Sequence, residues 1–412
     1  MINNLDTLVA LCKRRGFIYP GSEIYGGLAG TWDYGPLGVA LKNNLKNLWW
    51  KKFVTDREDM YGVDAAIIMN PKVWEASGHT AGFADPLTVD GKTEKFNTMF
   101  QTRVGATGEE AQVSYLRPET AQGMFVNFKN VVDSFHPKLP FGLAQIGKAF
   151  RNEIAPRDFI FRAREFEQME VEYFIHPKTG DWEKIFEGFR LGMHKFAEEI
   201  GLKEIHDLEV PEADRAHYSK RTIDMEFDYS FGLKELWGLA YRTSFDLEAH
   251  TKGSTVDLSY YDEETKERVM PHVIEPSFGV DRTILAILTS AYTEDELGGE
   301  KRVFLKLPTS LAPVTVAIFP LLKNKPDLVA KAREIFSSLK SNFQLSTFNF
   351  HFDDNGNIGK RYRRQDEIGT PYCVTIDFQT LEDGTVTLRH RDTGEQERIG
   401  QKDLTVVLLG HA

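Results

Sequence analysis

The chain has few cysteines and no long apolar run. Only Cys12 and Cys373 are present among 412 residues, too far apart in sequence to form a Cys-x-x-Cys pair or a disulfide framework. No uninterrupted apolar stretch approaches 18 residues, and the N-terminus lacks the order of a secretory signal. We therefore expect no membrane span, and two reduced thiols in a cytoplasmic protein.

A phosphate-binding P-loop is also missing. The nearest candidate, Gly91-Lys92-Thr93, has Pro86 where the first glycine of the loop belongs. The composition is otherwise ordinary for a globular protein, with 41% hydrophobic and 27% charged residues. At this length we expect two or three domains and a substantial core.

The charge is unevenly distributed. The net charge of −11 argues against a general nucleic-acid coat. From Thr309 to the end, 13 basic residues balance 13 acidic ones, so the preceding part, with 37 basic and 48 acidic residues, carries the whole excess. A neutral tail on an acidic body suggests that the tail meets a polyanion.

The most informative stretch runs from Phe150 to Glu170. Arg151 and Glu153 share one strand face, and Ala155–Asp158 reads as a turn. A second extended run is expected from Phe159, with one face that carries Arg162, Arg164, Phe166, Gln168 and Glu170. This hairpin offers guanidinium groups for phosphates and a ring for a base. The alternative is a solvated strand face with Arg–Glu pairs.

Periodicity predicts several further elements. Helices are expected over residues 1–16, from Leu37 to Phe53, over 181–200 and over 283–291, with Glu119 in the first turn of another helix. Glu235 is a candidate magnesium ligand, and Arg282 opens a helix after Gly279. As a lone acid, Glu235 would more often be plain surface.

The C-terminal part alternates strand and helix, which predicts a compact α/β domain. Strands are expected at 314–319, 374–377, 386–389 and 404–409, with a helix over 326–343. A basic cluster around Tyr362 is either an RNA-binding surface with one stacking ring or a solvated helix turn. Its members are Lys360, Arg361, Arg363 and Arg364.

The spacing of Phe150, Arg151, Glu153, Arg162, Phe166 and Glu170 resembles motif 2 of the class II aminoacyl-tRNA synthetases. Residues 30–54 resemble motif 1 and residues 275–291 motif 3, so the three motifs are expected near 30–54, at 145–174 and at 275–291. The resemblance covers nearly the whole chain and is closest to the homodimeric glycyl-tRNA synthetases. The segments that carry it include RRGFIYPGSEIYGG, WDYGPLG, WEASGH, LRPETAQGMFVNFKN, AQIGKAFRNE, REFEQME and EPSFG.

The resemblance implies an α+β protein. Residues 1–308 would form an antiparallel-sheet catalytic domain, and residues 309–412 an α/β anticodon-binding domain. The implied partners are ATP, Mg²⁺, glycine and tRNA(Gly), in a homodimer. The implied reaction makes glycyl-adenylate from glycine and ATP, then transfers the glycyl group to the 3′ end of the tRNA.

The resemblance also implies roles for individual residues. Arg151, Arg282 and Glu235 are expected to act in catalysis, with Glu235 on the metal. The ATP site would comprise Arg151, Asn152, Glu153, Phe161, Arg162, Phe166, Glu235, Leu236, Gly279, Asp281 and Arg282. The glycine site would comprise Glu119, Phe166, Glu167, Gln168, Glu170, Arg242, Glu275 and Ser277, with Arg242 on the glycine carboxylate. The tRNA would meet Lys360, Arg361, Arg363 and Arg364.

The chain departs from the family pattern between Phe83 and Asn97, where a longer insertion is usual, and at Tyr241 and Ser244. The alternatives are another class II synthetase of the same subgroup and a non-enzymatic relative that binds nucleic acid. The latter tends to lose the arginines of motifs 2 and 3, which this chain keeps. A class I synthetase is disfavoured because neither His-x-Gly-His nor Lys-Met-Ser-Lys-Ser occurs.

Overall fold

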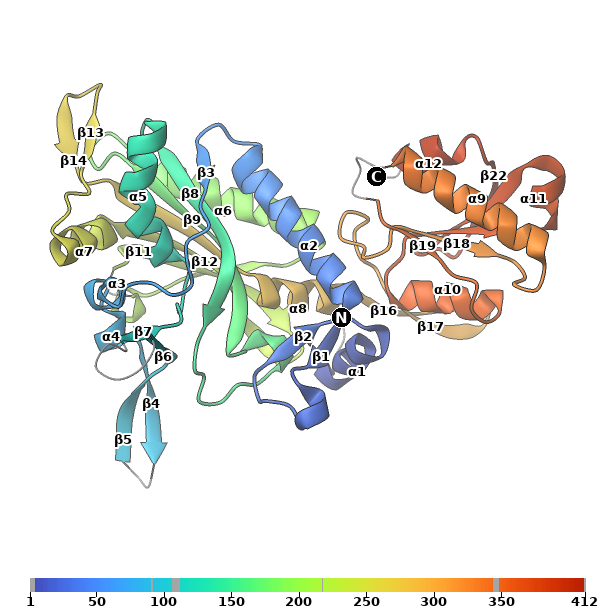
Figure 1. Ribbon diagram of the computed structural model, residues 1–412, viewed down its shortest axis with the longest axis horizontal. Helices are drawn as coiled ribbons and strands as arrows, with labels where there is room; N and C mark the ends of the chain where they lie inside the picture. The colour runs from blue at the N-terminus through green and yellow to red at the C-terminus, as the bar shows by residue number, and fades with distance from the viewer. Residues whose placement is uncertain (1–3, 90–91, 106–111, 217, 344–347, 411–412) are drawn as a thin grey trace.

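The computed structural model of the chain describes residues 4–89, 92–105, 112–216, 218–343 and 348–410, with the backbone alone for 84–89 and 92–95. Two sheets dominate the structure, and Figure 1 shows them side by side, each with its own helices. None of the helices in the described ranges has the length and apolar character needed to cross a bilayer.

The larger sheet has seven strands in the order β10-β11-β12-β15-β9-β8-β3. All neighbouring pairs are antiparallel except β3 with β8, so the antiparallel catalytic sheet expected from the sequence is confirmed. The strands are β3 (Met60–Gly62), β8 (Phe141–Phe150), β9 (Glu165–Ile175), β10 (His206–Glu209), β11 (Arg221–Tyr229), β12 (Gly232–Thr243) and β15 (His272–Gly279).

One face of this sheet packs on the main hydrophobic core. Met169, Val171 and Tyr173, alternate residues of β9, point into it together with Trp49 and Phe278. The helices that contribute to this core are α1 (Leu5–Arg15), α2 (Pro36–Trp50, continued by the π-helical turn Lys51–Thr55), α6 (Trp182–Glu199) and α8 (Val280–Ala291). The expected helices at these four places are therefore confirmed.

The opposite face carries polar residues along part of its length. Glu170, Glu172 and Phe174, the other set of alternate β9 residues, point to this side. Helices α5 (Ala121–Phe135) and α7 (Phe245–Ser254) cover its apolar end, where Phe125 packs against Phe174. Glu119 precedes α5 rather than lying in its first turn, because the helix begins only after Thr120.

Strands β8 and β9 pair as the antiparallel hairpin expected from the sequence, but the segment that connects them differs from the expected one. The run from Phe159 is a 3-10 turn (Phe159–Phe161), and β9 begins only at Glu165. Phe159 is buried and contacts Trp32 edge to face, 4.7 Å between ring centroids, so tertiary packing prevents its pairing with β8. Arg151 and Arg162 consequently lie in a loop and not on strands.

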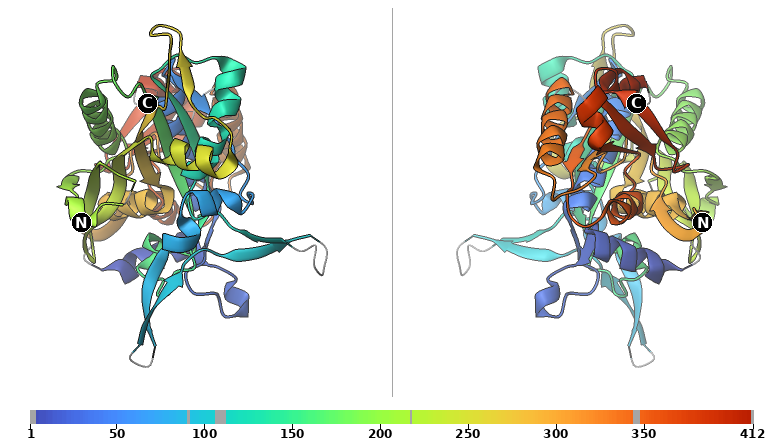
Figure 2. Two further views of the ribbon diagram at one scale, coloured as in Figure 1. Left: turned by 90° about the vertical axis from the view of Figure 1, so that its left-hand side faces the viewer. Right: turned by 90° about the vertical axis from the view of Figure 1, so that its right-hand side faces the viewer.

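Short hairpins, helices and turns surround the seven-stranded sheet. They are β1 (Ile18–Pro20) with β2 (Trp32–Tyr34), β4 (Ala84–Val89) with β5 (Lys92–Asn97), β6 (Gln101–Val104) with β7 (Gln112–Tyr115), and β13 (Tyr260–Asp262) with β14 (Glu267–Val269), besides the short helices α3 (Lys72–Ala76) and α4 (His79–Gly82) and the 3-10 turns Glu23–Tyr25 and Glu212–Asp214. Figure 2 shows β4–β5 and β6–β7 projecting from the body. The short segment between Phe83 and Asn97 is thus largely the β4–β5 hairpin.

The C-terminal part follows the hairpin of β16 (Tyr292–Leu297) and β17 (Glu300–Leu305). Its five-stranded sheet has the order β19-β18-β20-β21-β22, with β18 parallel to both of its neighbours. The elements are β18 (Val316–Pro320), α9 (Pro326–Asn342), β19 (Phe350–Phe352), α10 (Ile358–Glu367), β20 (Tyr372–Ile376), α11 (Phe378–Asp383), β21 (Thr385–His390), β22 (Gln396–Gly400) and α12 (Leu404–Gly410).

The strand expected at 404–409 is wrong, because this segment is helix α12. Leu404 and Leu408, four residues apart, are both buried on one helix face, while Val406 and Leu409 are exposed. Helix α10 connects the two parts of the chain, since Glu367 pairs with Arg15 of α1 at 2.5 Å. Both cysteines are buried free thiols.

Candidate active site

A cavity of about 380 Å³ opens on the polar face of the large sheet. The register of the strands builds its floor: Ser277 lies opposite Glu170 on one side and Gly238 on the other, and Gly238 lies opposite Asp224. A Cβ atom on Gly238 would meet no atom within 4 Å. Small residues in the middle of the floor, with acids beside them, leave room for a ligand that lies across the strands.

Arg151 lines the cavity and is held between two rings. Its guanidinium lies 5.2 Å from the ring centroids of both Phe83 and Phe166. Its Nε donates to the carbonyl oxygen of Pro118 at 3.1 Å. Because the planar group is fixed by stacking and a hydrogen bond, it is presented to the cavity in one orientation.

Arg282 lies on the same cavity, in the first turn of α8. Its guanidinium stands 4.6 Å from the ring centroid of Phe161, and its Nη1 lies 3.1 Å from the Glu235 carboxylate. Glu153 and Arg162, 3.5 Å apart, form a further ion pair on the cavity wall. The structure therefore brings together the arginines of the two expected nucleotide motifs.

The other expected ATP residues divide into two groups. Leu236 and Gly279 line the cavity, whereas Asn152 lines a neighbouring groove. Asp281 borders the cavity, but its carboxylate accepts hydrogen bonds from the Tyr34 hydroxyl (2.5 Å) and the Glu167 backbone N–H (2.7 Å). Asp281 thus ties α8 to β2 and β9.

Acidic residues gather at one end of the cavity floor, around Glu170. Glu119, Glu170 and Glu275 line it, together with Gln168 and Ser277. Ser277 Oγ donates to Glu170 Oε1 at 2.6 Å, and Thr120 donates to the other oxygen. Since all three glutamates are at least nine-tenths buried, this end suits a small cation such as an ammonium group.

His79 and Gln122 position the carboxylate of Glu119. Gln122 Nε2 donates to Glu119 Oε1 at 3.0 Å, and His79 Nε2 lies 3.3 Å from Oε2. Although burial raises the pKa of Glu119, the His79 ring, Arg242 and the Gln122 amide together hold it well below its usual range. His79 belongs to the segment WEASGH, but the sequence pattern predicted no role for it.

The other two acids of the cavity are harder to ionise. Burial, together with the charges of Glu170 and Glu119, raises the pKa of Glu275 to about 8, against the lowering effect of Arg242. Burial and the Glu119 charge raise the pKa of Glu170, although Ser277 and Thr120 partly offset this.

Two residues expected to bind glycine have their charged groups paired with other side chains. Arg242 is buried: Nε and Nη2 donate to Asp246, each at 2.8 Å, and Nη1 donates to both oxygens of Glu275 at 2.9 Å. The carboxylate of Glu167 instead pairs with Lys42 (2.7 Å) and Lys46 (3.0 Å) of α2. In the structure, Arg242 thus holds Glu275 and Glu167 holds α2, and their roles in glycine binding stay predictions.

Glu235 has an acidic neighbour that was not predicted from the sequence. Burial, with the charges of Glu235 and Glu226, raises the pKa of Asp224 to about 6. Both Asp224 and Glu235 line the cavity, and their oxygens are the hard donors that Mg²⁺ prefers. The alternation of apolar and acidic residues from Ile223 to Asp228 was a usable signal, because it puts the acids on one strand face.

The basic cluster on α10 is smaller than expected. Arg361 is buried, and its guanidinium donates to the carbonyl oxygens of Pro320, Asp354 (3.0 Å) and Gly356 (2.8 Å). Tyr362 is partly buried, and its hydroxyl group forms a hydrogen bond with the hydroxyl group of Thr375. Neither residue is free to meet RNA, since each links α10 to its own domain.

The remaining members of the cluster differ in exposure. Lys360 is exposed, and Arg363 pairs at 2.5 Å with the exposed Glu300. Arg364 is partly buried and pairs with Asp353 at 2.7 Å. The exposed basic surface of this helix is therefore mainly Lys360 and Arg363.

Two families match the chain. Residues 103–291 match the tRNA synthetase class II core domain (G, H, P, S and T), and residues 315–410 match the anticodon binding domain. Among curated relatives, the glycine–tRNA ligase of Thermobifida fusca is 48% identical, over 96% of this chain and 95% of the relative. Those of Clostridium beijerinckii (47%) and Streptomyces coelicolor (46%) each match over 96% of both chains. The chain therefore belongs to the glycine–tRNA ligases, a family of class II aminoacyl-tRNA synthetases.

Proposed function

We propose that this cavity joins glycine and ATP as glycyl-adenylate and then passes the glycyl group to the 3′ end of tRNA(Gly). The observation that carries the proposal is the shared cavity: it is lined both by two guanidinium groups with an aromatic ring and by three buried acids. The first set matches a nucleoside triphosphate and the second an ammonium group, so both substrates fit in one space.

Neither step needs a covalent protein nucleophile. The glycine carboxylate attacks the α-phosphorus, and pyrophosphate leaves from the opposite side. Such a displacement is accelerated by positioning and by stabilisation of the charge that develops on the phosphate oxygens. We assign Arg151 to the α-phosphate, because stacking on Phe83 and Phe166 holds its guanidinium in place before the substrate arrives.

Phe166 and Arg282 would enclose the adenine ring, with Arg282 also near the γ-phosphate. Glu153 and Arg162 would hold the nucleotide less directly. Glu235, with Asp224 beside it, would hold Mg²⁺, which neutralises phosphate charge when bound. For this purpose the ion pair between Arg282 and Glu235 would open, which is feasible because the Glu235 side chain is 48% exposed.

The acids would select glycine by leaving no room for a larger side chain. Glu119, Glu170 and Glu275 would grip the ammonium group, with Ser277 beside them. A methyl group on Cα would displace water from these carboxylates without replacing its hydrogen bonds, which is unfavourable. Discrimination would thus depend on desolvation as well as on shape.

The assembly and the domain boundaries are also part of the proposal. Residues 1–308 would be the catalytic domain and residues 309–412 the anticodon-binding domain of a cytoplasmic homodimer. Exposed apolar side chains before and within α2 support a subunit interface there; they are Ile24, Tyr25, Leu28 and Val39.

Amino-acid-dependent exchange of pyrophosphate into ATP tests the proposed reaction. With each of the twenty amino acids offered separately, we expect exchange with glycine alone. Exchange with proline or threonine would instead indicate another enzyme of the subgroup. No exchange with any amino acid would favour a nucleic-acid-binding relative without activity.

The exposed basic residues of α10 predict a salt effect. If Lys360 and Arg363 contact phosphates, the double change K360A/R363A should lower the slope of log K against log[salt] for tRNA binding by ~1–2. Arg361→Ala should instead destabilise the fold, by ~1–3 kcal/mol, because it leaves the buried carbonyl group of Pro320 without its donor. Filter binding and urea unfolding measure the two effects, and an unchanged slope in the double variant would leave α10 outside the tRNA interface.

A further inference from the structure

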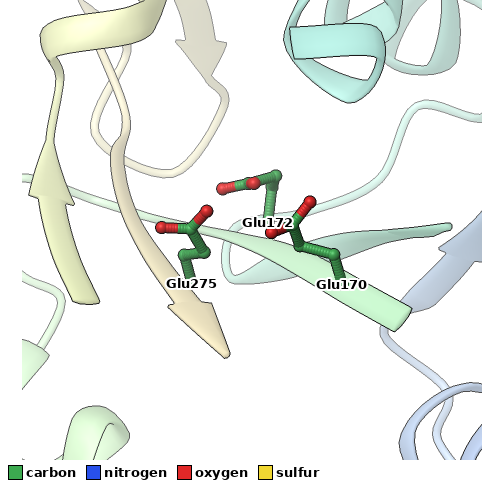
Figure 3. A group of neighbouring side chains, drawn as sticks. All are labelled: Glu170, Glu172 and Glu275. Atoms are coloured by element: carbon green, nitrogen blue, oxygen red, sulfur yellow. The ribbon is translucent and has the colours of Figure 1, made fainter. Parts of the chain in front are cut away.

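Three glutamates lie close together at the acidic part of the cavity. Carboxylate oxygens of Glu170, Glu172 and Glu275 all lie within 4.8 Å of one another, and all three residues are buried. Figure 3 shows them on the adjacent strands β9 and β15, with their carboxyl groups gathered on the same side of the sheet. Glu172 differs from the others because it does not line the cavity.

The charges around this group do not balance. Besides the three glutamates, the carboxyl groups of Glu119 and Asp246 belong to the same buried network. Among the described residues, Arg242 is the one guanidinium in this network, and its donors are already bound to Asp246 and Glu275. Arg117, also buried, interacts with Glu170 through its charge, while its Nε and Nη1 donate to the carbonyl oxygens of Lys148 and Ala65. Within the described part of the chain, five carboxyl groups therefore stand near two guanidinium groups.

Two histidines and a tyrosine also border the network. His79, from α4, lies against Glu119, and its other ring nitrogen bonds to Ser77. His250, from α7, bonds to the Gln122 side chain, and burial lowers its pKa, which favours the neutral ring. Tyr218 stacks on Arg242, and burial raises the pKa of its hydroxyl, so it stays neutral.

Glu172 is the group least able to carry a negative charge. It is fully buried, and neither of its carboxyl oxygens has a hydrogen-bond partner among the described residues. An ionised carboxylate without a donor is strongly unfavourable in such a place, whereas a protonated one can donate to a neighbouring carboxylate. Glu275 is the neighbour that shares the cluster and also faces the cavity.

We propose that Glu172 and Glu275 share one proton in the absence of substrate, and that the ammonium group of glycine displaces this proton into solvent. The inference rests on the proposed placement of glycine among the acids. One carboxylic O–H bond breaks, the proton passes to water, and the ammonium group brings one positive charge. The net charge of the cluster is then the same before and after binding.

The pKa values of the two acids agree with this exchange. Burial and the Glu275 charge keep the pKa of Glu172 well above its ordinary value, and that of Glu275 is about 8. Wherever the pair still holds its proton, this proton must be displaced, so the apparent affinity for glycine should rise about tenfold per pH unit and level off once the pair has titrated. Because the two acids titrate together, this pH dependence belongs to the pair and not to either residue alone.

Calorimetry measures the released proton directly. The whole protein is saturated with a non-hydrolysable α,β-methylene analogue of ATP at pH 7 and titrated with glycine in buffers of different ionisation enthalpy. We expect release of about one proton per glycine for the wild type and close to none for Glu172→Gln, whose amide replaces the protonated acid. Glu183→Gln, on the exposed face of α6, is the matched control and should behave as the wild type.

Several outcomes would overturn the inference. These are glycine binding without proton release in the wild type, an unchanged proton count in Glu172→Gln, and a stoichiometric metal ion in the purified protein. If Glu172→Gln does not fold, infrared difference spectra of the wild type replace it: glycine should abolish the band of a protonated carboxylic acid, and a persistent band contradicts the exchange. Absence of any glycine binding would instead count against the proposed glycine site itself.

Discussion

Arg151→Ala should lower the rate of glycine-dependent pyrophosphate exchange by two orders of magnitude or more, which corresponds to about 3 kcal/mol of transition-state stabilisation. The guanidinium is preorganised by the rings of Phe83 and Phe166, so it stabilises developing charge without first rearranging. The fold should survive, because the side chain is only partly buried and its Nε bonds to a single carbonyl. Exchange kinetics and circular dichroism measure the two effects.

Arg157→Ala is the matched control for this variant. Arg157 lies in the same loop, and its side chain is 67% exposed and only loosely paired with Asp158, at 3.5 Å. It does not line the cavity, so exchange should remain near the wild-type rate. Full exchange activity in Arg151→Ala would remove Arg151 from the chemistry, and equal losses in both variants would indicate a general effect on the loop.

Arg242→Ala should destabilise the protein by ~3–5 kcal/mol and raise the KM for glycine. The change leaves Asp246 and Glu275 as buried acids without the guanidinium that both share. Because Glu275 then loses the group that fixes its carboxylate, the glycine site should loosen as the fold weakens. Urea unfolding gives the free energy, and exchange at varied glycine gives the KM.

The exposed pair of Arg268 and Asp257, at 3.4 Å, provides the control for Arg242. Their side chains are 63% and 62% exposed, so Arg268→Ala should leave both stability and KM close to those of the wild type. A loss of stability in Arg268→Ala as large as that in Arg242→Ala would show that the effect does not depend on burial of the ion pair. If Arg242→Ala kept full stability while the KM for glycine rose, the guanidinium would bind the glycine carboxylate rather than hold Glu275.

The cavity could be predicted from the sequence where regular elements carry its residues. Phe166, Gln168 and Glu170 follow the two-residue period of a strand, so their common face can be recognised from the sequence alone. The helix that presents Arg282 is likewise marked by apolar periodicity after Gly279. In both places the local pattern and the tertiary structure agree.

The loop between β8 and β9 could not be predicted in the same way. Phe159 reads as a strand residue by composition, but it packs against Trp32, which lies far away in the sequence. A contact of this kind overrides local preference and leaves no periodic signal. Arg162 therefore reaches the cavity from a loop rather than from a strand.

Buried arginines were the other source of error. In the sequence, Arg242 and Arg361 look like surface or ligand-binding charges. Arg242 has one visible partner four residues on, Asp246, but its second partner, Glu275, lies on another strand. The acceptors of Arg361 are backbone carbonyls, which no side-chain pattern can reveal. Burial of a charge depends on tertiary partners, so it appears only in the folded structure.

A crystal structure of the protein with ATP and glycine tests the central claim most directly. We expect the α-phosphate within hydrogen-bond distance of the Arg151 guanidinium, the adenine ring between Phe166 and Arg282, and the glycine nitrogen among Glu119, Glu170 and Glu275. A nucleotide bound elsewhere, with these side chains making no contact to it, would contradict the account.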